Sequence, residues 1–255
     1  MKIATWNVNS IRVRLPHILK WLKDGNHDVL CLQETKVEDK DFPEPVFTEA
    51  GYNVTYSGQK TYNGVAIVSR HPLTEVNSTP ESIDPLQKRI VIASVAGIRL
   101  INVYVPNGSE VGSEKYEYKL QWLEALTQLI SRELQDFPRL VVLGDFNIAP
   151  EDRDVYDPEG WEGSVLVSDK ERRAFRALLK QSLVDVYRNF DQEAGAYSWW
   201  DYRAAAFRRN LGLRIDHILC SEPLAALCRS CVIDKTPRSW ERPSDHAPVI
   251  AEFET

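Results

Sequence analysis

The chain has 255 residues, of which 43% are apolar and 27% charged, a composition that supports a substantial core and excludes disorder. Its formal net charge of −6 is unlike the strongly basic balance of proteins that coat DNA, although an acidic chain can carry a local basic face. No apolar run approaches the ~18 residues of a membrane span, and the first residues lack the pattern of a signal peptide. We therefore expect a cytoplasmic protein without membrane association.

The first half of the sequence alternates apolar, β-rich runs with one amphipathic stretch. Residues 3–8 predict a strand, and Asn9 or Ser10 can cap the helix that follows, whose apolar residues 15, 18, 19 and 22 form a stripe. Pro16 belongs near the first turn of that helix, because proline removes a hydrogen bond further along. Further strands are predicted at residues 28–33, 52–57, 64–70, 90–95 and 100–105.

The second half adds two helices and three strands. Apolar residues 123, 126, 130 and 134 recur at helical spacing and predict a helix over about 114–134, and a second helix is predicted over 170–179. Strands are predicted at 140–143, 215–220 and 247–253. Many strands with few helices favour sheet packed on sheet with helices outside. Without a repeat or a linker, the chain is predicted to form one α/β domain over residues 1–255.

Polar residues stand where several of these strands end. Asn7 closes the first strand, Glu34 follows the second, and Tyr104 lies in the strand at 100–105. A carboxylate placed just past a buried strand is suited to bind a hard metal ion. Asp145 and Asn147 follow the strand at 140–143 at a spacing that points both side chains to one side, where they can position a water and a phosphate oxygen.

Two further segments add acids and a histidine. Asp245 directly precedes His246 ahead of the last strand, and Asp beside His can orient an imidazole and favour its protonated form. Asp216 supplies a carboxylate at the start of the strand at 215–220. Each of these residues has an ordinary structural interpretation when taken alone, such as turn capping or a surface ion pair.

Taken together and in this order, these segments resemble the exonuclease III family of AP endonucleases, within the endonuclease/exonuclease/phosphatase superfamily. The resemblance runs through nearly the whole chain and rests on nine segments: Trp6-Asn7-Val8-Asn9, Leu32-Gln33-Glu34-Thr35-Lys36, Gly58-Gln59-Lys60, Gly64-Val65-Ala66, Tyr104-Val105-Pro106-Asn107-Gly108, Gly144-Asp145-Phe146-Asn147-Ile148-Ala149-Pro150, Trp199-Trp200-Asp201-Tyr202-Arg203, Gly212-Leu213-Arg214-Ile215-Asp216 and Pro243-Ser244-Asp245-His246-Ala247-Pro248. It implies a four-layered α/β sandwich, in which two mixed sheets pack face to face with helices outside.

The resemblance also implies Mg²⁺- or Mn²⁺-dependent hydrolysis of DNA phosphodiesters. Glu34 is the implied chief metal ligand, helped by Asn7. Asp145 is implied to position and activate the attacking water, Asn147 to hold a phosphate oxygen, and Tyr104 to contact the phosphate or poise the water. A hard cation with few protein ligands suits this reaction, because such an ion keeps waters and shares substrate oxygens.

The remaining implied roles concern charge on the scissile phosphate. Asp245 is expected to orient His246, which stabilises that charge, and Asp216 is expected to act near the metal or the leaving 3′ oxygen. The implied activities are those of a 3′→5′ exonuclease, a 3′-phosphodiesterase and an AP endonuclease. The implied partner is double-stranded DNA with abasic sites or with damaged or recessed 3′ ends, bound by a monomer.

Binding DNA at a net charge of −6 needs local positive charge and a place for the terminal or base-less sugar. The candidate DNA-binding residues are Arg203, Arg208, Arg209, Arg214, Lys60, Arg89 and Asn107. The family builds a small apolar sugar pocket at positions that correspond here to Trp199, Leu213 and Ile215. A solvated charged face and an ordinary apolar core are the alternative interpretations of these two sets.

The sequence departs from the family after Trp161. Related AP endonucleases usually carry a small residue there, whereas this chain reads Ser164-Val165-Leu166-Val167. Leu166 is therefore a candidate gate at the lip of the site. Bulk at this position is predicted to hinder access of an extrahelical sugar and to leave a 3′ terminus accessible, so that internal AP-site incision is weak and 3′-end processing is retained.

Two other functions are compatible with parts of this pattern. The catalytic Asn, Glu, Asp-x-Asn and Asp-His segments are shared with superfamily phosphoesterases that act on inositol phosphates or another non-DNA phosphoester. A catalytically inert DNA-binding protein is an alternative of another class, although it has no need of the full set of polar residues. The segments around Trp199 and Leu213 favour the DNA branch.

Overall fold

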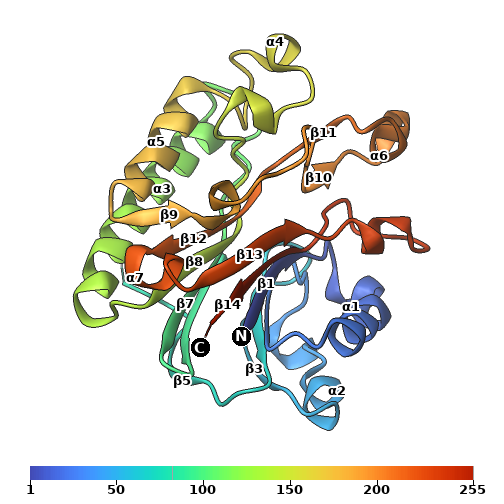
Figure 1. The fold of residues 1–255 in the computed structure, drawn as a ribbon, viewed down its shortest axis with the longest axis vertical. Helices are drawn as coiled ribbons and strands as arrows, with labels where there is room; N and C mark the ends of the chain where they lie inside the picture. Colours follow the sequence, from blue (N-terminus) through green and yellow to red (C-terminus); the bar gives the residue numbers. More distant parts are fainter. Residues whose placement is uncertain (82, 255) are drawn as a thin grey trace.

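The computed structural model describes residues 1–81 and 83–254, and two six-stranded sheets form its centre (Figure 1). The first sheet has the order β13 (Cys228–Ile233), β14 (Val249–Phe253), β1 (Lys2–Asn7), β2 (Val29–Gln33), β4 (Val65–Ser69), β3 (Asn53–Ser57). The second has the order β5 (Thr74–Asn77), β6 (Ile90–Val95), β7 (Ile98–Tyr104), β8 (Leu140–Asp145), β12 (Asp216–Ser221), β9 (Leu183–Asp185). Both are mixed, because β1 pairs with β2 and β7 with β8 in parallel while the other neighbours are antiparallel.

Helices lie on the outer faces of the two sheets (Figure 1). The first sheet is covered by α1 (Ile11–Gly25) and α2 (Glu44–Glu49), and the second by α3 (Glu114–Asp136) and α5 (Asp169–Leu179). Short helices α4 (Pro158–Trp161), α6 (Ala206–Arg209) and α7 (Glu222–Ala225) and the strand pair β10 (Trp199–Trp200) and β11 (Gly212–Leu213) complete the described chain. No helix among the described residues is both long and apolar enough to cross a bilayer.

Alternation along the strands produces the layers. Ile3 of β1 points into the core between the sheets, whereas its neighbour Ala4 packs against the outer helices. In the second sheet Val141 of β8 faces the inter-sheet core and Val142 packs beneath α3 and α5. Because both faces of the central strands are buried, they read as continuous apolar runs. The predicted four-layered α/β sandwich is confirmed.

The strands that sequence analysis missed are edge strands. β5, β9 and β13 each stand at the edge of a sheet, and β5 has mostly exposed side chains. Edge strands are commonly short and polar, a property that limits pairing with other chains. Such strands lack the apolar runs that marked the central ones. The predicted strands at 215–220 and 247–253 also begin later than expected, at Asp216 and Val249.

The start of α1 differs from the expected capping. Ser10 occupies the N-cap but makes no side-chain cap hydrogen bond. The backbone N–H groups of Ser10 and Ile11 donate instead to the carbonyls of Glu34 and Thr35, just past β2. Pro16 lies inside the helix rather than in its first turn. The backbone contacts tie the start of α1 to the segment that carries Glu34.

Candidate active site

Polar residues from both sheets meet at one edge of the sandwich. Asn7 ends β1, and Glu34 directly follows the parallel neighbour β2. Tyr104 and Asp145 end the parallel strands β7 and β8, where they are paired in register. Asp216 starts β12 directly opposite Asp145, because β12 runs antiparallel to β8. The carboxyl ends of four strands and the start of a fifth therefore deliver their side chains to one place.

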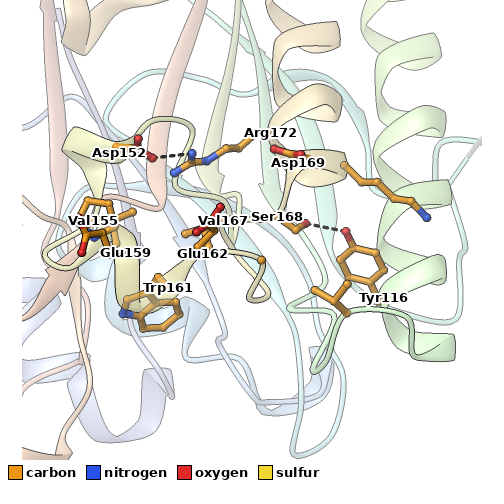
Figure 2. A pocket seen from close by; sticks show the side chains of 14 residues that line it. Tyr116, Asp152, Val155, Glu159, Trp161, Glu162, Val167, Ser168, Asp169 and Arg172 are labelled. Carbon is orange, nitrogen blue, oxygen red and sulfur yellow. Dashed lines mark hydrogen bonds and ion pairs between the residues drawn. The ribbon is translucent and has the colours of Figure 1, made fainter.

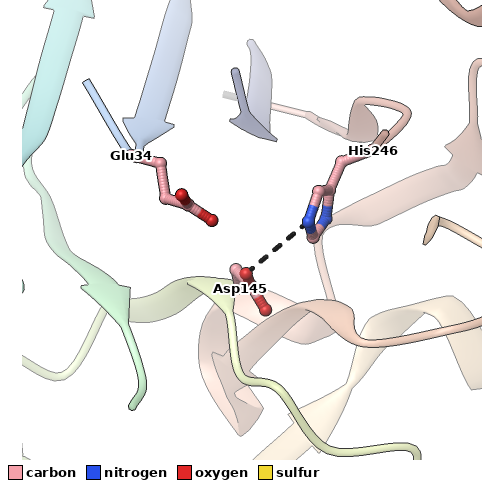
Figure 3. Close-up of side chains that lie close together, drawn as sticks. All are labelled: Glu34, Asp145 and His246. Atoms are coloured by element: carbon pink, nitrogen blue, oxygen red, sulfur yellow. Dashed lines mark ion pairs between the residues drawn. The ribbon is translucent and has the colours of Figure 1, made fainter. Parts of the chain in front are cut away.

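Glu34, Asp145 and His246 form the centre of this site (Figure 3). One ligand atom from each lies within 4.8 Å of the others. Asn7 Nδ2 donates to Glu34 Oε1 at 2.8 Å and to Asp145 Oδ2 at 2.9 Å. His246 Nε2 lies 3.8 Å from Asp145 Oδ2, at the distance of an ion pair without a hydrogen bond. The Asn7 amide thus bridges the two carboxylates, and the His246 imidazole lies beside Asp145.

Asp216, and not Asp245, orients His246. His246 Nδ1 lies 2.9 Å from Asp216 Oδ2, and Ser198 Oγ donates to the same oxygen at 2.6 Å. The Asp245 carboxylate accepts hydrogen bonds from Asn9 Nδ2 and Trp199 Nε1, both at 3.0 Å. The expected role of Asp245 as the orienting acid was therefore wrong, whereas a role of Asp216 near the metal or the leaving 3′ oxygen stays a prediction. Neighbouring side chains in an extended segment point to opposite sides, so adjacency to His246 in sequence separated Asp245 from the imidazole.

Burial and charge set the protonation states at the centre. Burial alone would lower the pKa of His246, but the carboxylates of Asp216 and Asp145 raise it to about 10. Burial, together with the charges of Asp216 and Glu34, raises the pKa of Asp145 to about 7 against the opposing effects of His246 and Asn7. His246 is therefore a cation at neutral pH, and Asp145 is poised to exchange a proton there.

Tyr104 and Asn147 flank this centre. Burial, followed by the charges of Glu34 and Asp145, raises the pKa of the Tyr104 hydroxyl well above its usual value, so this group acts as a hydrogen-bond donor. The Arg89 guanidinium lies 4.6 Å from the centroid of the Tyr104 ring. Asn147 has a left-handed backbone at φ 49°, and its N–H donates to Asp145 Oδ1 at 2.9 Å. Its side-chain oxygen accepts from Asn107 Nδ2 at 3.1 Å.

The residues expected to form a sugar pocket and its gate do lie together. Leu213, Ile215 and Leu166 belong to one buried cluster, with the half-buried Trp199 packed against it. A bridge between Trp199 and His246 places this cluster beside the catalytic centre. Leu166 is 5% exposed and has a φ of 75°, a conformation that a side chain with a branched Cγ seldom adopts.

Arg214 does not belong to the DNA-binding surface. Its side chain is 1% exposed, with Nε 2.7 Å from Asp154 Oδ1 and Nη2 2.8 Å from Asp185 Oδ2. The expectation was wrong because alternation turns Arg214 away from the side on which Leu213 and Ile215 join the apolar cluster.

The other basic candidates remain at or near the surface. Arg203, Arg208 and Arg209 are exposed around α6, as is Lys60. Arg203 pairs with Asp201. The Asn107 side chain is also exposed, and Arg89 is half-buried under Tyr104. These residues keep their predicted place as candidates for contact with DNA.

Sequence comparison identifies the family. The profile described as the Endonuclease/Exonuclease/phosphatase family matches residues 4–246. Exodeoxyribonuclease III of Haemophilus influenzae is 35% identical over 267 aligned positions, covering 99% of this chain and 100% of the relative. The chain belongs to the Endonuclease/Exonuclease/phosphatase family. Within it, the chain is a member of the exonuclease III group, which confirms the predicted resemblance.

Solved structures agree with this assignment. The 3′ phosphatase NExo from Neisseria, determined with a product DNA hairpin, is 48% identical with a TM-score of 0.96, and each chain covers 100% of the other. An AP endonuclease from Archaeoglobus fulgidus is 43% identical with a TM-score of 0.95, again with 100% coverage of both chains. This member of the exonuclease III group is thus similar both to a 3′ phosphatase and to an AP endonuclease.

The donor set of this exonuclease III relative fits a hard metal ion, as expected for a family of metal-dependent nucleases. Glu34 and Asp145 face one another and supply the oxygen ligands that such an ion prefers. Asn7 Nδ2 donates to both carboxylates, and Asn7 Oδ1 accepts the backbone N–H of Asn9 at 3.0 Å. These contacts make Asn7 a donor that orients both carboxylates, and its role as a metal ligand stays a prediction.

Sequence reasoning missed three polar side chains that support the site. Ser198 fixes Asp216, and Lys36 Nζ lies 2.8 Å from Glu34 Oε2. Lys119 is buried and donates to the carbonyl of Asn147 at 2.7 Å. A signal for Lys119 was available, since it lies on the stripe of α3 that Tyr116, Leu123 and Leu126 define, where an apolar side chain is expected. Ser198 lies one position before the segment that begins at Trp199, and its sequence context did not indicate a role in the site.

Proposed function

We propose that this chain is a Mg²⁺- or Mn²⁺-dependent DNA repair nuclease of the exonuclease III type that acts chiefly at 3′ ends. The observation that carries the proposal is the meeting of Glu34, Asp145 and His246 beside a buried apolar cluster that includes Leu166. The relatives named above act as exodeoxyribonuclease III, 3′ phosphatase and AP endonuclease, which supports DNA as the substrate. We further propose that residues 1–255 act as one domain and as a monomer.

The roles follow from charge and geometry. Asp145, whose pKa lies at about 7, accepts a proton from the attacking water. His246 carries positive charge and stabilises the anionic phosphate as charge develops on it. Glu34 would hold the metal ion, which would lower the pKa of bound water and neutralise phosphate charge, with Asp145 facing it as the base. The products are a 3′-hydroxyl and a 5′-phosphate.

Two further groups bind the phosphate. The Tyr104 hydroxyl is protonated across the neutral range and donates a hydrogen bond to a phosphate oxygen. The Asn147 amide nitrogen lies 3.4 Å from Asp145 Oδ2 and donates to the carbonyl of Val105 at 3.0 Å, a position from which it would contact a second phosphate oxygen. As fixed hydrogen-bond donors, the two groups stabilise the charge that develops on the phosphate in the transition state better than water does.

Leu166 sets the balance between substrates. Its side chain packs into the cluster of Leu213 and Ile215, at the place where a flipped, base-less sugar would bind. A 3′ terminus can present its last phosphodiester without inserting a sugar from within a continuous strand. Strong 3′-end removal with weak internal incision therefore follows.

The test uses a 5′-labelled duplex with an internal abasic analogue and a recessed 3′ end, incubated with Mg²⁺ and separately with EDTA. We expect a ladder from the 3′ end in Mg²⁺, little internal cleavage, and no product in EDTA. Leu166→Gly should raise the ratio of internal to terminal cleavage, since glycine adopts the φ of 75° without strain and opens the pocket. An unchanged ratio would remove Leu166 from this role, and the absence of any DNA product would refute the proposed function.

A further inference from the structure

A fully buried ion pair lies behind the active site. Lys119 of α3 and Glu171 of α5 form a salt bridge in which both side chains are 0% exposed. Removing two charges from water is costly, and an apolar pair of similar volume often gives equal or greater stability. The contacts of the pair indicate what it does instead.

Lys119 joins two loops that carry substrate-binding candidates. Its ammonium group donates to the carbonyl of Asn107 at 3.1 Å and to that of Asn147 at 2.7 Å, and its third donor meets Glu171. These carbonyls belong to the loops that follow β7 and β8. All three N–H donors of the ammonium are therefore used, and each holds a backbone or a carboxylate rather than substrate.

Glu171 holds the segment of residues 165–168, here named the gate segment. Glu171 Oε1 accepts the N–H of Leu166 at 3.0 Å, and Oε2 accepts the N–H of Ser168 at 3.1 Å and its hydroxyl at 2.5 Å. The Leu166 carbonyl accepts from the N–H of Ala149 at 2.8 Å. Hydrogen bonds on both sides of Leu166 thus maintain its left-handed conformation, which would otherwise relax.

A cavity gives the gate segment room to move. A hollow of about 580 Å³ is lined by Trp161 and Tyr116 and by Val167 and Ser168 of the segment itself (Figure 2). The Tyr116 hydroxyl is 2.6 Å from Ser168 Oγ, and both side chains line this hollow. If the contacts to Glu171 were lost, Ser168 would keep Tyr116 and Leu166 would keep Ala149, and the cavity would leave the segment room to shift Leu166 away from Leu213 and Ile215.

We propose that the Lys119–Glu171 pair is a positioning device that sets substrate choice by holding Leu166 in the sugar pocket and Asn147 beside Asp145. The inference rests on the proposed function, because it concerns which DNA substrate the site accepts. Neither residue touches substrate, so both act through the backbone that they hold. Weakening the Lys119–Glu171 pair should therefore release the gate segment and also make the position of Asn147 less well defined.

The perturbation is Glu171→Gln, which places an amide donor where Leu166 and Ser168 already donate. Its matched control is Glu117→Gln, the same substitution in an exposed pair between the same two helices, with Glu117 Oε1 3.6 Å from Lys170 Nζ. A second variant, Lys119→Met/Glu171→Gln, leaves no unpaired buried charge and covers the case in which the single variant fails to fold. Thermal unfolding establishes that each variant is folded.

The readouts are steady-state rates on a recessed 3′ end and on an internal abasic analogue, and hydrogen exchange at the amides of Leu166 and Ser168. We expect Glu171→Gln to raise the ratio of internal to terminal cleavage roughly 2- to 30-fold, the range that coupled networks transmit. The kcat for the 3′ end should fall, by up to about 100-fold for a displacement of Asn147 by ~1 Å, while KM changes little. Both amides should exchange faster, and Glu117→Gln should match the wild type.

The possible outcomes distinguish failure of the proposed function from failure of this inference alone. A wild-type chain that cleaves no DNA would refute the proposed function, and this inference with it. A wild-type chain that cleaves DNA, with an unchanged cleavage ratio in both folded Glu171 variants, would overturn this inference alone. A change of equal size in Glu117→Gln would also overturn it, because a general effect on α3 and α5 would then explain the result.

Discussion

The pairing of His246 with Asp216 makes a sharp prediction about the dependence of the reaction on pH. The substitution Asp216→Asn keeps the shape of the side chain and removes its charge, with His246 Nδ1 only 2.9 Å away. At a charge separation of about 4 Å and an effective dielectric constant of about 20, the lost attraction is about 4 kcal/mol. That energy corresponds to a decrease of about 3 in the pKa of His246.

The sign of the effect follows from the state that the mechanism needs. Wild-type His246, with a pKa of about 10, stays protonated through the neutral range, so its loss of charge affects the rate only on the far alkaline side. In Asp216→Asn the pKa falls to about 7, and the rate should begin to fall from neutral pH upward. The partial charge of nearby Asp145 will offset some of this decrease.

The assay is the pH profile of 3′-end hydrolysis at saturating metal ion, from pH 6 upward, for the wild type and two variants. Asp245→Asn is the matched control, because Asp245 directly precedes His246 in the sequence but bonds Asn9 and Trp199 instead of the imidazole. The alkaline limb should move by about 3 pH units in Asp216→Asn, the size worked out above, and far less in Asp245→Asn. Equal movement in both variants, or none in either, would refute the assignment of Asp216 as the orienting group.

Two more predictions concern the arginines. Arg214→Met should lower the free energy of unfolding by about 3–5 kcal/mol, because it leaves buried Asp185 unpaired and removes one of the two arginines that pair with buried Asp154, whereas the exposed Arg203→Met should leave urea unfolding essentially unchanged. Replacing Arg208 and Arg209 together by alanine should reduce the slope of log K against log salt by roughly 2, one counterion for each phosphate contact; a slope equal to the wild type in a DNA-binding titration would exclude both contacts.

The sequence predicted the central strands and the long helices because burial on both faces leaves apolar runs and helical stripes. It predicted where the acids would stand, since strand ends place Glu34, Asp145 and Asp216 at one edge of the sandwich. It failed where side-chain direction decides the role. Arg214 and Asp245 were assigned by neighbourhood in sequence, and alternation of the backbone turned each toward different partners.

Hydrogen bonds between residues far apart in the chain could not be predicted from the sequence either. Ser198 is 18 positions from the Asp216 that it holds, and Lys119 is 52 positions from Glu171. Local sequence patterns indicate local structure only. Nothing in the residues next to Ser198 or Lys119 indicates which distant carboxylate accepts its hydrogen bond. The position of Lys119 on an apolar stripe is the exception, because a charge there demands a buried partner.

The backbone of the site explains why such buried charges are placed behind it. Glu34, Asn147 and Leu166 all have positive φ, at 51°, 49° and 75°. Conformations of this kind each cost about 1–3 kcal/mol and persist only where the surroundings fix them. Apolar packing is non-directional and does not hold a peptide group in one orientation. Hydrogen bonds are directional, and those of Lys119 and Glu171 fix the peptide groups of Asn147 and Leu166 at the cost of burying two charges. The need to fix these peptide groups gives a physical reason for a polar network in an otherwise apolar layer.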